Sequence, residues 1–323
     1  MTRLTTTRRG LPKAAAAAPA LALPAPLMAQ ISGPAGRGNP AHFRFDLGTA
    51  RITVVSDGHL GLTIDGLGVN ADPTDVLAFL EAHRLSTTGH YSHTNHVVIE
   101  TGDATVLVDV GSGDRFLPTA GRLLDNLTEA GIDHGAITHV VITHAHPDHI
   151  WGIRDDFDEP IFPAAEYVIG AGEYDWWMQD GLAGSVPAEM QQFVVGAVNS
   201  LTADGLDWTM AQDGHEVVPG VRLISTPGHT LNHMSVMVES DGKQLLALGD
   251  AMTHAYISME RPDWFAGFDQ DGPMASATRL RLLDMAATDG IAVLGYHFPF
   301  PGVGHVMRMG DAYRFVPALW TWG

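Results

Sequence analysis

The chain of 323 residues contains no cysteine. Disulfides and thiolate metal ligands are therefore excluded, and any metal site must be built from histidine, aspartate and glutamate. Basic residues are also scarce, with 18 lysines and arginines against 37 acids and a net charge of −19. Because nucleic acids and anionic membranes are bound through clustered basic residues, we expect neither as a partner. What remains is a globular protein whose 45% hydrophobic content is enough for one large core or two small ones.

The first thirty residues have the order of an export signal. Two arginines in Thr7–Lys13 are followed by an alanine-rich run at Ala14–Ala25 and by further small residues. This order is typical of the twin-arginine route, and the apolar run is too short to span a bilayer as a helix. We therefore interpret residues 1–29 as a cleaved twin-arginine signal, 30–40 as a flexible leader and 41–323 as one domain of a periplasmic protein. A disordered basic tail is the alternative interpretation.

Three histidines and an aspartate crowd the loop His144–His149, which has the sequence His-Ala-His-Pro-Asp-His. The β-branched run Ile137–Thr143 before it predicts a buried strand. Pro147 prevents regular pairing beyond that strand. Imidazole and carboxylate are ligands of Zn²⁺ and similar divalent ions, and the loop holds more of them than one tetrahedral site takes from one segment. Two adjacent metals are therefore indicated, although some clustering among 17 histidines arises by chance.

Residues of the same kind follow three later predicted strands, namely His229 after 221–225, Asp250 after 244–248 and His297 after 291–294. A predicted strand, helix and strand between Thr105 and Thr143 also indicate a βαβ unit. The loops of such units meet at one edge of a sheet. We therefore expect all of these side chains to lie close together.

Local sequence signals predict turns and helices in the rest of the chain. Hairpins are predicted around Gly48 and around Asp241-Gly242, and the second strand of the first hairpin is predicted to end at Asp57-Gly58. Helices are predicted to begin at Asp72-Pro73 and to cover 277–287.

Two segments near the start of the domain have less certain roles. Apolar residues alternate over 60–64, which predicts either a half-exposed strand or one flank of a pocket. His90, His93 and His96 lie in a polar segment without a turn that directs them toward the histidine loop. We interpret these three histidines as structural.

The His-x-His-x-Asp-His loop, followed in order by single His, Asp and His positions, resembles the signature of the metallo-β-lactamase superfamily. The resemblance covers essentially the whole chain after the signal segment. It implies an α/β (α+β) fold, a four-layer αββα sandwich with a dinuclear metal centre at one edge of its two sheets. Carried over by position, the implied ligands are His144, His146 and His229 for one metal, Asp148, His149 and His297 for the other, and Asp250 as the bridge between them.

Segments 297–305, 313–317 and 107–111 resemble a smaller group in that superfamily, methyl parathion hydrolase and its lactonase and arylesterase relatives. This resemblance implies an exported enzyme and a homodimer.

Four residues are expected to line the substrate pocket. The resemblance implies this position for Phe116 and Trp177. Thr253 and His254 follow the bridging position and are polar where the organophosphate-degrading members are apolar. The polar pair favours a lactone or an ester over a phosphotriester.

Two divalent cations close together lower the pKa of a bridging water and polarise a carbonyl or phosphoryl oxygen. We therefore expect a dinuclear-metal hydrolase of small neutral esters or lactones, such as N-acyl homoserine lactones or aryl esters. It would use a metal-bridging hydroxide and hydrolyse organophosphate triesters as a side activity. Asp250 is expected to hold the metals and Asp148 to pass a proton to the leaving group. Zn²⁺ is the expected metal, and Mn²⁺, Co²⁺ and Fe accept the same ligands.

Other functions remain open. A dedicated phosphotriesterase would use the same centre. A β-lactamase of this fold is disfavoured, because those members lack a carboxylate at the position of Asp250 and several use cysteine. A glyoxalase-type thioesterase would need a basic extension, and a nuclease is disfavoured by the net charge. A non-catalytic periplasmic metal-binding protein would have no need of a bridged site.

Overall fold

The computed structural model describes residues 39–319, apart from the side chain of Glu189. The predicted export signal at 1–29 and most of the predicted leader at 30–40 lie outside the described residues, so both stay predictions. Residues 39–319 form one compact unit. Within 39–319, no helix is both long enough and apolar enough to cross a membrane.

The first half of the domain forms a seven-stranded sheet whose strands lie side by side in chain order. Neighbours from β1 to β4 are antiparallel, and neighbours from β4 to β7 are parallel. Its strands are β1 (His42–Leu47), β2 (Ala50–Thr63), β3 (Gly89–Thr101), β4 (Ala104–Val108), β5 (His139–Ile142), β6 (Glu166–Gly170) and β7 (Trp208–Ala211).

The second half repeats this plan in another seven-stranded sheet, again in chain order. β11 and β12 are parallel, and the other neighbours are antiparallel. The predicted hairpin across Asp241-Gly242 is confirmed as β10–β11. The strands are β8 (Glu216–Val218), β9 (Val221–Ser225), β10 (Met234–Ser240), β11 (Lys243–Ala247), β12 (Ala292–Leu294), β13 (Val303–Met309) and β14 (Ala312–Pro317).

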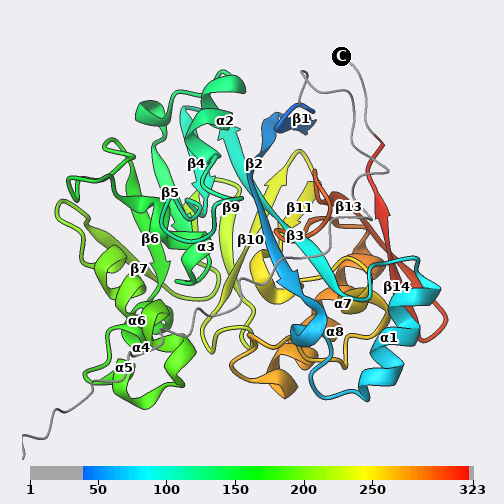
Figure 1. The fold of residues 1–323 in the computed structure, drawn as a ribbon. Coiled ribbons are helices and arrows are strands. Elements are labelled where there is room, and N and C mark those ends of the chain that lie inside the picture. The colour runs from blue at the N-terminus through cyan, green and yellow to red at the C-terminus, as the bar shows by residue number, and fades with distance from the viewer. Residues whose placement is uncertain (1–38, 320–323) are drawn as a thin grey trace, which may run out of the picture. The chain divides into compact units, whose positions relative to one another are not determined.

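Helices cover the outer faces of the two sheets (Figure 1). The helices of residues 39–319 are α1 (Pro73–Ala82), α2 (Leu123–Glu129), α3 (Pro147–Ile150), α4 (Ala171–Trp177), α5 (Leu182–Ser185), α6 (Ala188–Leu201), α7 (Ile257–Glu260) and α8 (Gly272–Asp289). Of these, α1 packs against Ile257 and Trp264 and not against a sheet. Short 3-10 turns are η2 (Ile64–Gly66), η3 (His134–Ala136), η4 (Trp151–Ile153) and η5 (Gly249–Ala251).

Three buried clusters define four layers. Valines of both sheets, such as Val54 and Val236, share the central cluster. Ile142 on the other face of the first sheet shares a cluster with Leu127 of α2 and with residues of α6. Leu246 on the second sheet shares a third cluster with Leu282 of α8. The structure is therefore the predicted αββα sandwich.

The parallel strands bring polar loops to one edge of this sandwich. The strands end shortly before the predicted metal ligands, β5 before His144, β11 before Asp250 and β12 before His297. Because neighbouring parallel strands point the same way, the loops that follow them open on the same side.

The predicted end of β2 was wrong. We expected the strand to end at Asp57-Gly58, but β2 continues to Thr63 while still paired with β3. The register shifts between Ser56 and Gly58, and Gly58 has a φ of 119°. The glycine therefore forms a β-bulge instead of a turn, because a residue without Cβ can adopt this conformation inside a strand.

Helix boundaries follow their caps. Asp72 accepts a hydrogen bond from the Thr74 amide at 2.8 Å and begins α1 as predicted. α8 is longer than the predicted 277–287, because Asp271 accepts from the Met274 amide at 2.9 Å and Gly290, with a φ of 69°, ends the helix.

Candidate metal centre

The predicted histidine loop leaves β5 and turns directly into α3. Pro147 occupies the first helical position and His146 the N-cap, so the helix starts inside the motif. This turn buries the side chains of His144, Asp148 and His149 together with that of His146, and none of the four residues is more than 6% exposed. The loop therefore delivers several donors to one buried point.

Three imidazoles form the first group of donors. His144 Nε2 lies 3.0 Å from His146 Nδ1, and His146 Nδ1 lies 3.0 Å from His229 Nε2. Tetrahedral nitrogen ligands of one zinc ion would lie roughly 3.3 Å apart. The three nitrogens are thus spaced as ligands of a single ion, with His229 supplied by the second sheet through the loop after β9.

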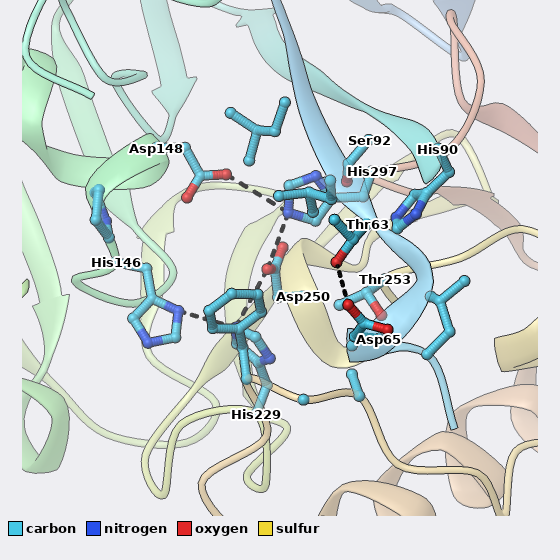
Figure 2. Close-up of a pocket in the computed structure, with 18 of the residues that line it drawn as sticks. Thr63, Asp65, His90, Ser92, His146, Asp148, His229, Asp250, Thr253 and His297 are labelled. Atoms are coloured by element: carbon cyan, nitrogen blue, oxygen red, sulfur yellow. Dashed lines mark hydrogen bonds and ion pairs between the residues drawn. The ribbon is translucent and has the colours of Figure 1, made fainter. Parts of the chain in front are cut away.

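Asp148, His149 and His297 form the second group. The Nε2 atoms of His149 and His297 each lie 3.5 Å from Asp148 Oδ2. Asp250 lies between the two groups, as Figure 2 shows for its position beside His229 and His297. Its Oδ2 is 3.2 Å from His229 Nε2 and 3.1 Å from His297 Nε2, and its Oδ1 is 3.3 Å from His149 Nε2. The structure therefore brings all seven predicted donors together.

Three of the donor atoms at this point lack hydrogen bonds. Asp148 Oδ2, His149 Nε2 and Asp250 Oδ1 are buried and have no hydrogen-bond partner in the described part of the chain. A buried polar atom left unsatisfied costs about 1–3 kcal/mol. Three such atoms at one point indicate a ligand, and imidazole nitrogen with carboxylate oxygen is the donor set of divalent transition metals. The residues present therefore fit two divalent cations.

Hydrogen bonds at the second ring nitrogen fix four of the five histidines. Such contacts set the tautomer and the orientation of a metal-binding imidazole. The Nδ1 contacts are His149 with Asp109 Oδ2 at 2.8 Å, His229 with Asp269 Oδ1 at 3.3 Å, His297 with the His93 carbonyl at 2.8 Å and His144 with Thr143 Oγ1 at 3.1 Å.

Sequence reasoning missed the roles of Asp109 and Asp269. Asp109 follows β4, and its carboxylate also accepts from the Thr143 amide at 2.8 Å. Its place at a strand end was a usable signal, the same one that identified the predicted ligands. Asp269 lies in a loop and pairs with the buried Arg279, so only the tertiary fold reveals it.

Glu173 joins the two loops that supply the first group. Its Oε1 accepts from the Ala145 amide at 3.1 Å and from Trp177 Nε1 at 2.6 Å, and its Oε2 accepts from Thr230 Oγ1 at 2.6 Å. The expected pocket position of Trp177 was wrong. The indole is fully buried, because its N–H is used to hold Glu173, and its ring lies 5.8 Å from that of His146.

The surroundings set the charge states of the donors. Burial lowers the pKa of His144 and of His146 well below the ordinary range, so both rings are neutral, the form that binds metal. Burial alone would lower the pKa of His149 and raise that of Asp250. Neighbouring carboxylates instead raise the pKa of His149 well above its usual value, and the positive charges on His297 and His149 hold the pKa of Asp250 well below its own.

A cavity of about 450 Å³ opens over the donors. Its base includes His146, Asp148, His229, Asp250 and His297. No lysine or arginine belongs to the described lining. Much of the wall is apolar, with Leu60, Leu62, Leu67, Phe116, Phe193 and Phe268.

Of the other three residues expected to line the pocket, two do so and one does not. Phe116 and Thr253 lie in the cavity wall. His254 does not line the cavity, so its expected position was wrong; its ring packs against that of His90 at a centroid distance of 5.8 Å. His90 itself lines the cavity, although we interpreted it as structural. The period-two alternation of β3 was the signal that could have placed His90 on this face.

The fold and the clustered donors define a metal-dependent hydrolase. Residues 91–296 match the family model of the metallo-β-lactamase superfamily, and the chain belongs to that superfamily. Among curated relatives, an N-acyl homoserine lactonase of Bacillus sp is 25% identical over 205 residues, which cover 57% of this chain and 73% of the relative.

Two solved structures share the fold over most of the chain. AidC, described as a dizinc quorum-quenching lactonase in complex with a product, N-hexanoyl-L-homoserine, has a TM-score of 0.82 at 22% identity. AbOPH, described as a hydrolase in the β-lactamase superfamily, has a TM-score of 0.81 at 23% identity. Each comparison covers 88% of this chain and 100% of the other.

Proposed function

We propose that the protein is a dinuclear zinc hydrolase of small neutral lactones, with N-acyl homoserine lactones as leading candidates and aryl esters as further substrates. The observation that carries this proposal is a pair of donor groups joined by Asp250 at the base of a cavity whose described lining has no lysine or arginine. An uncharged substrate needs no counter-charge in such a cavity. The lactonases among the relatives support the same substrate class.

In this proposal each donor group holds one Zn²⁺ ion, and Asp250 is shared. The first ion is assigned to His144, His146 and His229, and the second to Asp148, His149 and His297. When bound, the ions would supply a Lewis acid and an activated water.

Asp148 is the residue that we expect to move the proton. It lines the cavity, and its Oδ2 is free of hydrogen bonds within residues 39–319. An ionised carboxylate in this position can accept the proton of the attacking water and return it to the leaving oxygen. Tyr296 donates from its hydroxyl to the Asp148 carbonyl, which holds the backbone of this residue in place.

A substrate panel tests the proposal. The purified protein, loaded with Zn²⁺ or Mn²⁺, would be assayed with N-hexanoyl homoserine lactone, p-nitrophenyl acetate, methyl paraoxon and a cephalosporin. We expect the highest kcat/KM on the lactone, a lower value on the aryl ester and a minor one on the phosphotriester. Highest activity on paraoxon or on the cephalosporin would favour the phosphotriesterase or the β-lactamase. Two bound metals without any turnover would favour a metal-binding protein.

Export and assembly are separate parts of the proposal. The twin-arginine pattern supports a periplasmic protein, and sequencing of the mature amino terminus should find Gln30 as the first residue. A full-length protein retained in the cytoplasm would contradict export. Light scattering of the purified protein should give the mass of a homodimer, and a monomer mass would contradict that assembly.

A further inference from the structure

One wall of the cavity is built from facing positions of β2 and β3. Leu62 pairs with His90 and Leu60 pairs with Ser92, and all four residues line the cavity. Because alternate residues of a strand point to the same face, β3 presents its two polar side chains to the same space. Figure 2 shows His90 on the side of the cavity away from His146.

His90 has unused hydrogen-bonding capacity on this wall. Its Nδ1 is buried without a partner among the described residues, whereas Thr63 and Asp65 nearby are hydrogen-bonded to each other at 3.1 Å. Burial, reinforced by the charge of His297, lowers the pKa of His90 to about 4. The ring is therefore neutral at pH 7 and offers one N–H donor and one bare nitrogen acceptor.

Packing rather than hydrogen bonding holds this ring. The ring of His254 lies edge-on to that of His90 at an angle of 65°. His254 is itself fixed, because its Nδ1 accepts from the amides of Tyr256 and Ile257, both at 3.2 Å. His90 is thus positioned without either of its nitrogens being used for that purpose.

We propose that His90 hydrogen-bonds a secondary amide of the substrate, attached beside the bond that is hydrolysed, and so selects acylated amino-lactones over simple lactones. A secondary amide has one carbonyl acceptor and one N–H donor, and a nitrogen of a neutral imidazole can hydrogen-bond either of them. This inference rests on the proposed function and adds to it a residue that determines specificity. The reacting carbonyl would lie over the donors at the cavity base, so His90 would act on binding geometry and take no part in the proton transfer.

Two substrates and three variants test this role. The kcat/KM of the zinc-loaded enzyme would be measured on N-hexanoyl homoserine lactone and on γ-decanolactone, which has the ring without the amide. His90→Phe keeps a planar ring without hydrogen-bonding atoms, His90→Gln keeps a donor and an acceptor, and His59→Phe is a matched control outside the described cavity lining. Metal content would be determined for each variant.

We expect His90→Phe to lose about 10- to 100-fold on the amide-bearing lactone, the cost of leaving a buried polar group unpaired, and less than about 3-fold on γ-decanolactone. His90→Gln should recover most of the loss, and His59→Phe should match the wild type on both substrates. If His90→Phe keeps two metals and its kcat/KM falls equally on both lactones, the proposed role of His90 is overturned, and the proposed lactonase function is not. A wild type inactive on both lactones would overturn the proposed lactonase and this inference with it.

Discussion

Asp250 joins the two donor groups through its two carboxylate oxygens. Its Oδ2 lies close to His229 and His297, and its Oδ1 lies close to His149. The carboxylate is also the residue that the β-lactamases of this fold are expected to lack. Substitution of Asp250 therefore distinguishes a centre whose two metals share a ligand from two independent metal sites.

We predict that Asp250→Ala loses at least one metal equivalent and that its kcat/KM falls by roughly 100-fold or more, because both ions lose a shared ligand. Elemental analysis and lactone hydrolysis check the two parts. Asp103→Ala, which removes an exposed carboxylate in the turn after β3, should retain both metals and normal turnover. Two ions and normal rates in Asp250→Ala would contradict the bridging assignment.

His254 is a largely buried histidine that the proposed centre does not use. Burial lowers its pKa to about 3, from an ordinary value of 6.5. Since the folded-state pKa is below the unfolded one, this residue stabilises the fold above pH 6.5. That contribution is lost as the pH falls from 6.5 toward 3, because the unfolded chain takes up the proton first.

His254→Asn should weaken this pH dependence. The Asn side chain can supply an acceptor for the Tyr256 and Ile257 amides but does not titrate. Between pH 7 and pH 5 the wild type should lose about 2 kcal/mol more unfolding free energy than the variant, at about 1.4 kcal/mol per pH unit below 6.5. Urea unfolding at both pH values measures the difference. Identical losses in the two proteins would show that His254 does not titrate as described.

At the scale of elements, the bulge in β2 positions one side of the cavity. Asp57 accepts from the amides of Ser112, Gly121 and Leu123, at 3.3, 3.1 and 2.7 Å, so it holds both ends of the loop that contains Phe116. The next residue, Gly58, contacts the same loop closely. A Cβ on Gly58 would overlap the carbonyl oxygen of Thr119.

We predict that Gly58→Ala lowers the free energy of unfolding by roughly 2–4 kcal/mol and raises KM, because the strand and the loop must separate. Gly102→Ala is the control. Gly102 also has a positive φ, 56°, but a Cβ added there would have no atom within 4 Å, so the loss should be only about 1–2 kcal/mol. Denaturant unfolding compares the two, and equal losses would show that the close approach to Thr119 has no energetic weight.

The elements and the proposed ligands could be predicted because their signals are local. The β-branched residues before His144 predict a strand, and Asp241-Gly242 predicts a hairpin turn, without any information from distant residues. Each predicted donor follows such a strand. The bulge at Gly58 was not predictable in the same way. A glycine after an aspartate has the sequence of a turn, and only pairing with β3 decides that the strand continues.

The cavity wall was predicted less well, because burial depends on contacts distant in the sequence. Trp177 could have packed in the core or faced the substrate, and the buried Glu173 that takes its N–H lies one helical turn before it. His90 and His254 exchanged their expected roles. Which of two packed histidines faces the cavity depends on how β3 lies against the loop after β11, and the sequence of neither segment contains that information.

At the scale of the whole molecule, the donors come from both sheets. The loop after β5 supplies His144 to His149, and the second sheet supplies His229, Asp250 and His297. Each proposed ion therefore has ligands from both halves of the chain. Metal binding should stabilise the packing of one sheet against the other.

We predict that removal of metal with a chelator abolishes lactone hydrolysis and lowers the melting temperature by roughly 10 °C. An ion present at a thousand times its Kd contributes about 4 kcal/mol. Added Zn²⁺ should restore both properties. The chelator should shift the melting temperature of Asp250→Ala less than that of the wild type. Unchanged rates and melting after complete metal removal would contradict a metal-dependent centre.

The chain-order arrangement of the two sheets has a consequence during synthesis. A ribosome that has released only the first sheet has delivered the histidine loop but none of the three partners from the second. The last of them, His297, emerges only after β12 has been made. Polypeptides that stop after the first sheet can therefore be folded in that half and still be inactive, and the complete donor set exists only once β12 and His297 have been made.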